Sequence, residues 1–262
     1  MIFTKMQGLG NDYLYVYGEV EDPSTLSQKL SERHFGAGSD GMIFILPSEV
    51  ADFRMRIYNA DGSEAAMCGN GIRCVGKYVY DKGYTGKTHL NIETMSGIRT
   101  LELTVVGDCV TEVSVDMGVT EVKAPMTLSV LGEQITCIPV SVGNPHAVVF
   151  VPDAEAVALS TVGPAIEKHE AFPGGVNAEF VQVIDNHTLR MRVWERGSGI
   201  TMACGTGACA SVSAAVTAGY CPRDEFISVH LDGGVLKIRV DAEGRVTMVG
   251  PAEFVYEGDV KL

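Results

Sequence analysis

The chain has 262 residues, 46% of them hydrophobic and 20% charged, with a formal net charge of −13 at pH 7. A chain of this length buries a substantial core, and this composition excludes a disordered or fibrous protein. The excess of negative charge argues against nucleic acid as a partner, because contacts with phosphate need clustered Lys and Arg.

The residues that open the chain turn polar before they form an apolar core of signal-peptide length, and no later stretch approaches the roughly 20 apolar residues of a membrane span. We therefore expect a cytoplasmic protein with no membrane partner. Seven cysteines are an odd number, and a chain of this size needs no disulfides, so we expect reduced thiols. The spacings of Cys68 to Cys74 and of Cys204 to Cys209 do not match zinc knuckles, and we expect no metal site.

In chain order, the first expected helix covers residues 23–34, with Asp22 as its cap and Pro23 in its first turn. Two further helices are expected at 69–82 and 205–218, and the second is composed almost entirely of small or apolar residues. Both should be buried. Period-two alternation predicts strands with one buried face at 53–58, 100–105, 188–193 and 235–240.

One motif occurs twice. Met67-Cys68-Gly69-Asn70-Gly71 opens one of the expected central helices, and Ala203-Cys204-Gly205-Thr206-Gly207 opens the other. Gly10-Asn11-Asp12 recurs in the same way as Gly143-Asn144-Pro145, and Asp40 before a strand at 42–46 recurs as Asn177 before a strand at 180–184.

This duplication predicts a mixed α/β fold of two pseudo-symmetric domains, with the active site in a cleft between them. The first domain would cover residues 1–118 and 250–262, with the final strand around 254–256 returning to it. The second would cover 119–249. In each domain we expect strands wrapped around the central helix.

The position of the two cysteines favours acid–base chemistry. At a helix N-terminus the pKa of a thiol can fall from about 8.5 into the range of about 3.5 to 7.5. The backbone amides that follow, at Gly69, Asn70, Gly205 and Thr206, are suited to binding a carboxylate. Inversion of a carbon needs a base on one face and an acid on the other, and a duplicated thiol meets that need.

Other candidates lie within the repeated units: His146 at the start of a strand, Glu195 and Arg196, and five turn-like asparagines, Asn11, Asn59, Asn70, Asn144 and Asn177. Each alone has an ordinary interpretation, as a solvated charge or a turn residue. Together they suit a zwitterionic substrate, with Arg196 as a clamp for a carboxylate and Glu195 as a partner for an ammonium group. The remaining histidines and the five cysteines Cys74, Cys109, Cys137, Cys209 and Cys221 are interpreted as structural, the cysteines as core residues.

The segments from Asn59 to Cys74 and from Glu195 to Ala208 resemble the two signatures of diaminopimelate epimerases. Lys5 to Asp12 and Gly143 to His146 resemble that family as well, so the similarity spans essentially the whole chain. The resemblance implies two similar domains, each an antiparallel, barrel-like sheet around a central helix. It also implies a homodimer that interconverts LL- and meso-diaminopimelate without a cofactor, in the synthesis of lysine and peptidoglycan precursors.

The resemblance also assigns roles. Cys68 and Cys204 would be the acid and base, with His146 and Glu195 tuning them or relaying protons. The backbone amides of Gly69, Asn70, Gly205 and Thr206 would bind the reacting carboxylate, and the rest of the substrate would contact Asn11, Asn59, Asn144, Asn177, Glu195 and Arg196. The chain departs from many members at Gly41, where they have Gln, and at Ile200, where they have Glu.

Three alternatives stay open. Proline racemases, hydroxyproline epimerases and histidine racemases resemble this architecture and can use the same pair of thiols. A redox switch built on the two cysteines is the second alternative. The third is a protein that binds an amino acid without catalysis.

Overall fold

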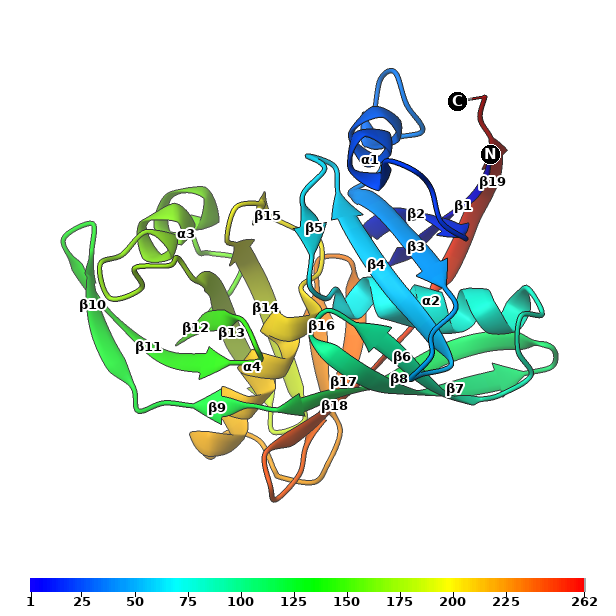
Figure 1. Cartoon of the computed structure of the whole chain (residues 1–262). Coiled ribbons are helices and arrows are strands. Elements are labelled where there is room, and N and C mark those ends of the chain that lie inside the picture. The colour runs from blue at the N-terminus through cyan, green and yellow to red at the C-terminus, as the bar shows by residue number, and fades with distance from the viewer. Residues whose placement is uncertain (262) are drawn as a thin grey trace. The chain divides into compact units, whose positions relative to one another are not determined.

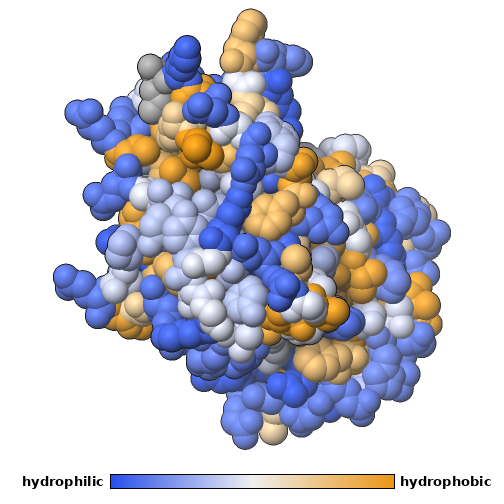
Figure 2. Space-filling view, turned by 90° about the vertical axis from the view of Figure 1, so that its right-hand side faces the viewer, coloured by the Kyte–Doolittle hydropathy of each residue, from blue (hydrophilic) through white to orange (hydrophobic). Residues whose placement is uncertain are grey.

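The computed structural model describes residues 1–261 and divides them into two compact units, one of Met1–Val115 with the segment from Gly250 onward, the other of Asp116–Val249. The sequence-based boundary between residues 118 and 119 lies close to this division. Hydrophilic residues cover most of the face in Figure 2, and apolar residues form small separate groups on it, in keeping with the high charge.

The first unit contains two helices, α1 (Pro23–Ser31) and α2 (Gly69–Asp81). Its strands are β1 (Ile2–Gly8), β2 (Asn11–Tyr17), β3 (Gly41–Leu46), β4 (Phe53–Asn59), β5 (Glu64–Ala65), β6 (His89–Thr94), β7 (Gly97–Val106), β8 (Cys109–Val119), which continues past the division, and β19 (Glu253–Asp259). β19 pairs antiparallel with β1, so the chain returns to the first unit after Val249.

Helix α2 is the core of this unit (Figure 1). Every residue from Gly69 to Val79 is buried. A Cβ atom added at Gly76 would lie 2.8 Å from a Leu101 methyl on β7, and one at Gly71 would lie 2.6 Å from a methyl of Ile43 on β3. The helix therefore packs closely against strands on more than one side, as its sequence predicted.

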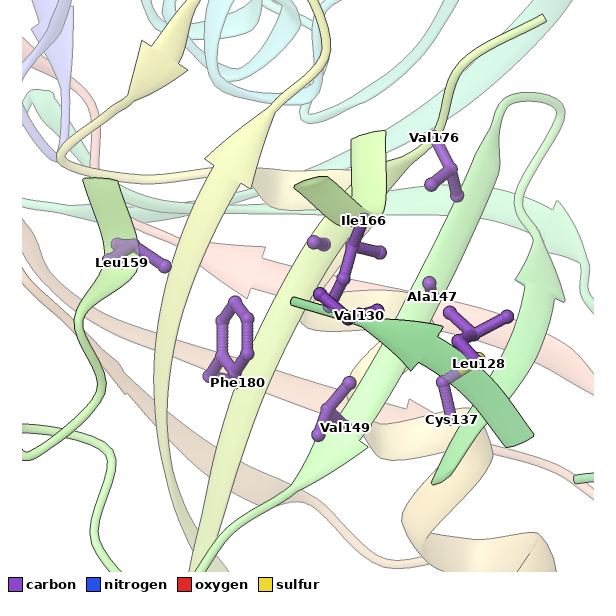
Figure 3. Packing of buried hydrophobic residues seen from close by; sticks show 10 residues of the cluster. Leu128, Val130, Cys137, Ala147, Val149, Leu159, Ile166, Val176 and Phe180 are labelled. Atoms are coloured by element: carbon purple, nitrogen blue, oxygen red, sulfur yellow. The ribbon is translucent and has the colours of Figure 1, made fainter. Parts of the chain in front are cut away.

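The second unit contains α3 (Leu159–Glu167) and α4 (Gly205–Thr217). Its strands are β9 (Glu121–Val122), β10 (Met126–Val130), β11 (Glu133–Ser141), β12 (Pro145–Phe150), β13 (Asn177–Asp185), β14 (Thr188–Glu195), β15 (Gly199–Ile200), β16 (Ile227–Leu231), β17 (Gly234–Val240) and β18 (Arg245–Gly250). Helix α4 is buried along most of its length, and α3 closes a cluster of apolar side chains against β10 to β13 (Figure 3).

The strand pairings of the two units repeat in the same order. In the first unit β2 pairs parallel with β3 across α1, and β4 pairs parallel with β6 across α2. In the second unit β12 pairs parallel with β13 across α3, and β14 pairs parallel with β16 across α4. Antiparallel pairs join β3 to β4 and β13 to β14 in between. The sheets are therefore mainly antiparallel, with two parallel pairs in each unit.

The register of these strands relates individual residues of the two units. Met42 pairs with Tyr58, and Ala178 pairs with Trp194. Met42 therefore corresponds to Ala178, and the residues just before them, Gly41 and Asn177, correspond to each other. Asn59 and Glu195 correspond in the same way. The expected match of Asn177 with Asp40 is wrong by one residue. The same register matches Tyr13 with His146, and Ile43 with Glu179.

The helix predictions were correct in place and slightly long at their ends, since the observed helices stop at Ser31, Asp81 and Thr217. Helix α3 was not expected. Its sequence contains Gly163 and Pro164, and its N-cap Ala158 makes no side-chain capping bond. None of the helices within residues 1–261 combines the length and the apolar character that crossing a lipid bilayer requires.

Candidate active site

Cys68 is the N-cap residue of α2, and its sulfur accepts a hydrogen bond from the Gly71 amide at 3.3 Å. The thiol also donates to Asn11 Oδ1 at 3.3 Å. A helix has no acceptor of its own for its first amides, so those of Gly69 and Asn70 point out of its N-terminus. The structure therefore brings Asn11, Cys68, Gly69 and Asn70 together within the first unit.

The other side chains around Cys68 come from the starts of β2 and β3. Asn11 donates to Asp40 Oδ2 at 2.8 Å, and the same oxygen accepts from the Asp12 amide. Tyr13 lies beside Cys68 and is 6% exposed. Burial, followed by the charges of Cys68 and Asp40, raises the pKa of Tyr13 well above its usual 10.0, so this hydroxyl stays protonated.

Asn59 and Asn70 differ in their surroundings. Asn59 ends β4, and its amide donates to Ser63 Oγ at 3.1 Å, as in an ordinary turn. Asn70 is buried in the first turn of α2, where its Oδ1 accepts from Arg73 at 3.0 Å. Arg73 is fully buried and also donates to the carbonyl of Pro251. The Asn70 side chain is thus held by the protein through Arg73.

Cys204 repeats the arrangement of Cys68 in the second unit. It is the N-cap residue of α4, and its sulfur accepts from the Gly207 amide at 3.3 Å. The residue is 5% exposed. The backbone amides of Gly205 and Thr206 occupy the helix positions that those of Gly69 and Asn70 occupy in α2.

The electrostatics of Cys204 differ from the expected ones. Burial, and then the negative charges of Glu195 and Glu179, raise the pKa of the Cys204 thiol well above its usual 9.0, while Thr206 and the Gly207 amide act in the opposite direction. The prediction of a lowered pKa is therefore wrong for Cys204, because desolvation and two carboxylates outweigh the helix terminus. In this state Cys204 is a thiol and suited to act as an acid.

Glu195 ends β14 and lies beside that thiol. Its carboxylate accepts hydrogen bonds from the Thr201 hydroxyl and from Cys204, and burial raises its pKa. The negative charge of Glu179 raises the pKa of Glu195 further, and His146 lowers it. The structure thus gathers His146, Glu195 and Cys204, which the sequence had selected, around Glu179, which it had not.

A chain of hydrogen bonds leads from Glu179 to the Cys204 sulfur. Glu179 Oε1 lies 2.6 Å from His146 Nδ1, and His146 Nε2 lies 3.0 Å from Asn144 Oδ1. Asn144 Nδ2 donates to Thr206 Oγ1 at 3.3 Å, and Thr206 Oγ1 lies 3.5 Å from Cys204 Sγ. Asn144, which we expected to contact the substrate, therefore also links His146 to Thr206.

Asn177 and Arg196 form a second group in this unit. Asn177 Oδ1 accepts from the Arg196 amide at 2.8 Å, and Asn177 Nδ2 donates to the Pro145 carbonyl. The guanidinium of Arg196 donates to the Gly174 carbonyl at 2.9 Å and is otherwise exposed, so it keeps donors for an anion. Among residues 1–261, no group of three or more His, Cys, Asp or Glu side chains could hold a metal ion.

Four of the five cysteines interpreted as core residues, Cys74, Cys137, Cys209 and Cys221, are buried. Cys109 is exposed, which corrects that interpretation. It starts β8 directly after a tight turn at Gly107, where a polar environment is the rule.

Solved structures define the class of fold. A phenazine biosynthesis protein of the PhzF family from Bacillus anthracis superimposes with a TM-score of 0.80 at 18% identity, covering 100% of this chain and 99% of that one. A hydroxyproline epimerase from Agrobacterium vitis superimposes with a TM-score of 0.74 at 16% identity, covering 99% and 90%. The predicted mixed α/β fold, which the chain shares with these two proteins, is confirmed.

Sequence comparison is more specific. The family model for diaminopimelate epimerase matches residues 3–123 and 138–255. A diaminopimelate epimerase from Methanococcus maripaludis strain C6 is 49% identical over 282 residues, covering 100% of both chains, and one from Acetivibrio thermocellus is 50% identical over 281 residues, covering 100% of this chain and 99% of that one. The chain belongs to the diaminopimelate epimerase family, which confirms the resemblance seen in its motifs.

Proposed function

We propose that this chain interconverts LL- and meso-diaminopimelate by moving a proton at one α-carbon, with Cys68 and Cys204 as the acid–base pair. One observation carries the proposal. Each unit of this member of the family presents a cysteine as the N-cap of its central helix, with the same 3.3 Å bond from the third amide of that helix to the sulfur.

The reaction requires a proton to leave a carbon that is only weakly acidic, and the negative charge that develops spreads into the neighbouring carboxylate. Backbone amides at a helix N-terminus stabilise such charge. Gly69, Asn70, Gly205 and Thr206 supply these amides in the proposal. One sulfur takes the proton as a thiolate while the other, as a thiol, donates a proton to the opposite face, and the roles exchange in the reverse reaction.

The remaining contacts decide which amino acid is accepted. Arg196, with its exposed guanidinium, would bind the distal carboxylate, and Glu195 would bind an ammonium group as well as contacting Cys204. The asparagines at the turns, Asn11, Asn59, Asn144 and Asn177, would complete the site with neutral donors and acceptors. No cofactor is needed in this proposal, since the helix amides take the place of an electron sink.

The thiol chemistry requires reduced cysteines, which supports a cytoplasmic location. The likeness to the family supports a homodimer, and light scattering of the purified protein tests this expectation directly.

The central test is the loss of either thiol. Cys68→Ala and Cys204→Ala should each lower the rate of inversion by at least about 10²-fold, because each removes a group that takes or gives the proton. The rate is measured as deuterium entering the α-carbon of LL-diaminopimelate in heavy water, and circular dichroism checks the fold. Cys109→Ala, at the exposed thiol, is the matched control and should have full activity.

Full turnover in either variant of the pair contradicts the proposal. Proline, hydroxyproline and histidine, assayed in parallel, separate this activity from that of the related racemases. Activity should be the same with and without added pyridoxal phosphate, and a chelator should not reduce it.

A further inference from the structure

The buried carboxylate of Glu179 has no counterpart among the expected site residues. Its side chain and that of His146 are both 0% exposed. Oε1 contacts His146 Nδ1 at 2.6 Å, whereas Oε2 has no hydrogen-bond partner within residues 1–261. A buried carboxylate with an unsatisfied oxygen is costly for folding. Its presence therefore calls for a reason other than stability.

The internal repeat shows that the fold itself does not require this pair. The strand register matches Glu179 with Ile43 and His146 with Tyr13. A Cβ atom added at Gly71 would meet Ile43 at 2.6 Å, and one added at Gly207 would meet Glu179 Oε1 at 2.8 Å. The same space beside the capping cysteine is filled by an apolar side chain in one unit and by a carboxylate in the other.

The contacts fix the direction of the first hydrogen bond. A carboxylate can only accept, so His146 Nδ1 carries a proton and donates it to Glu179. The second ring nitrogen, Nε2, lies 3.0 Å from Asn144 Oδ1, so both nitrogens of the ring have a partner. Asn144 Nδ2 then donates to Thr206 Oγ1, which lies 3.5 Å from the Cys204 sulfur, so the contacts of His146 continue to this thiol.

The order of these contacts places Glu179 at the buried end of the chain. Its Oε1 lies 2.6 Å from one nitrogen of the His146 ring, and Asn144 Oδ1 lies 3.0 Å from the other. The ring is therefore held between a buried carboxylate and the side chains that lead to Cys204.

We propose that Glu179 is a positioning residue for proton transfer at Cys204, acting through His146 by keeping Nδ1 protonated and the ring oriented toward Asn144. The inference rests on the proposed function of Cys204. The inference adds Glu179 to the site, although this residue is hydrogen-bonded to His146 and not to the Cys204 sulfur.

The first experiment replaces the charge and keeps the shape. In Glu179→Gln we expect kcat for diaminopimelate to fall by at least about tenfold, with KM within about twofold, because the ring loses its fixed orientation while substrate contacts remain. Glu155→Gln, at an exposed carboxylate of the same unit, is the control and should have wild-type kinetics. A folded Glu179→Gln protein with wild-type kcat overturns the inference.

A spectroscopic readout separates positioning from a general structural effect. In nitrogen-15 histidine spectra of the wild-type protein, His146 should show a protonated Nδ1. In Glu179→Gln the amide can donate as well as accept, so the ring should lose this single state. An unprotonated Nδ1 in the wild type, or the same ring state in both proteins, contradicts the inference.

Two further variants test the route through His146. Glu179→Gln added to His146→Gln should lower kcat by less than about twofold further, because the intermediary is already gone. Multiplied losses would show that Glu179 acts independently and would overturn the inference. If a single variant does not fold, the combination of His146→Tyr with Glu179→Ile copies the pair of the first unit and leaves neither partner unsatisfied. That protein should fold and have low kcat, and full activity contradicts the inference.

The two proposals fail in different ways. Wild-type protein that incorporates no deuterium from heavy water shows that the proposed function is wrong, and the role of Glu179 falls with it. An active wild type with an equally active Glu179→Gln protein shows that only the inference is wrong.

Discussion

At the scale of single residues, the two capping cysteines have the same backbone position and different surroundings. Cys204 lies between the carboxylates of Glu179 and Glu195, whereas the residues matching these positions near Cys68 are Ile43 and Asn59. The fold therefore supplies two similar positions, and the side chains around them make the two thiols chemically unequal. The proposed reaction starts each turnover with one acid and one base, and such inequality suits it.

The charge of Glu195 contributes to the raised pKa of Cys204, so Glu195→Gln should lower that pKa. The pH at which Cys204 is half-maximally alkylated by iodoacetamide should fall by roughly one unit, measured by mass spectrometry of the Cys204 peptide. Glu155→Gln serves again as the control with an unchanged midpoint. A midpoint that stays in place or rises in Glu195→Gln contradicts the assignment of this charge effect.

Gly41 is a position where the structure leaves no room for a side chain, since a Cβ atom there would lie 2.1 Å from the Tyr58 carbonyl. Ile200, by contrast, is 48% exposed.

The sequence could predict Cys68 and Cys204 as candidate site residues, because it shows directly that a motif with glycines at a helix start occurs twice. It could not predict Glu179. Asn177-Ala178-Glu179-Phe180 reads as an ordinary strand segment, and nothing local shows that the Glu side chain is buried beside His146. Only the pairing of β12 with β13 brings the two residues together.

At the scale of elements, the helices that hold the site were predictable and α3 was not. Helices α2 and α4 have clear starts, α2 with apolar residues at helical spacing and α4 with almost only small or apolar residues, whereas α3 contains both a glycine and a proline. Its stability comes from tertiary packing, since Leu159 and Ile166 belong to the buried cluster of Figure 3.

The glycine of α3 provides a test of this packing. A Cβ atom at Gly163 would lie 2.6 Å from Trp194 Cβ, a rigid part of that side chain. Gly163→Ala should therefore destabilise the protein by about 1–2 kcal/mol, since the overlap outweighs the gain of up to about 1 kcal/mol in helix propensity. Urea denaturation measures the change. Gly86→Ala, where no atom lies within 4 Å, should be neutral, and equal stability of both variants contradicts the packing argument.

At the scale of the whole molecule, buried thiols lower the free energy of unfolding when the pH becomes alkaline. Burial raises the pKa of Cys137 from its usual 9.0 to about 11. As the pH rises, the Cys137 thiol therefore loses its proton in the unfolded chain before it does in the folded protein. The contribution of this thiol to the free energy of unfolding is complete below pH 9 and is lost as the pH rises through 11.

Removal of this thiol should reduce the alkaline loss. Cys137→Val should match the wild type near pH 7 and lose about 2 kcal/mol less of its free energy of unfolding at pH 11. Urea denaturation at the two pH values measures the difference, with Cys109→Val, at the exposed thiol, as the control. An identical alkaline loss in Cys137→Val and wild type would show that the buried thiol does not titrate as described.

The return of β19 to β1 has a consequence for the order in which the polypeptide is completed on the ribosome. The second unit is one continuous stretch, Asp116–Val249, whereas the first needs residues 253–259 to pair with β1. The Met1 ammonium group also donates to the Val260 carbonyl at 2.6 Å. The portion of the molecule translated first is therefore the last to gain all its hydrogen bonds, and Cys68 belongs to the unit that waits until residues 253–259 have been translated.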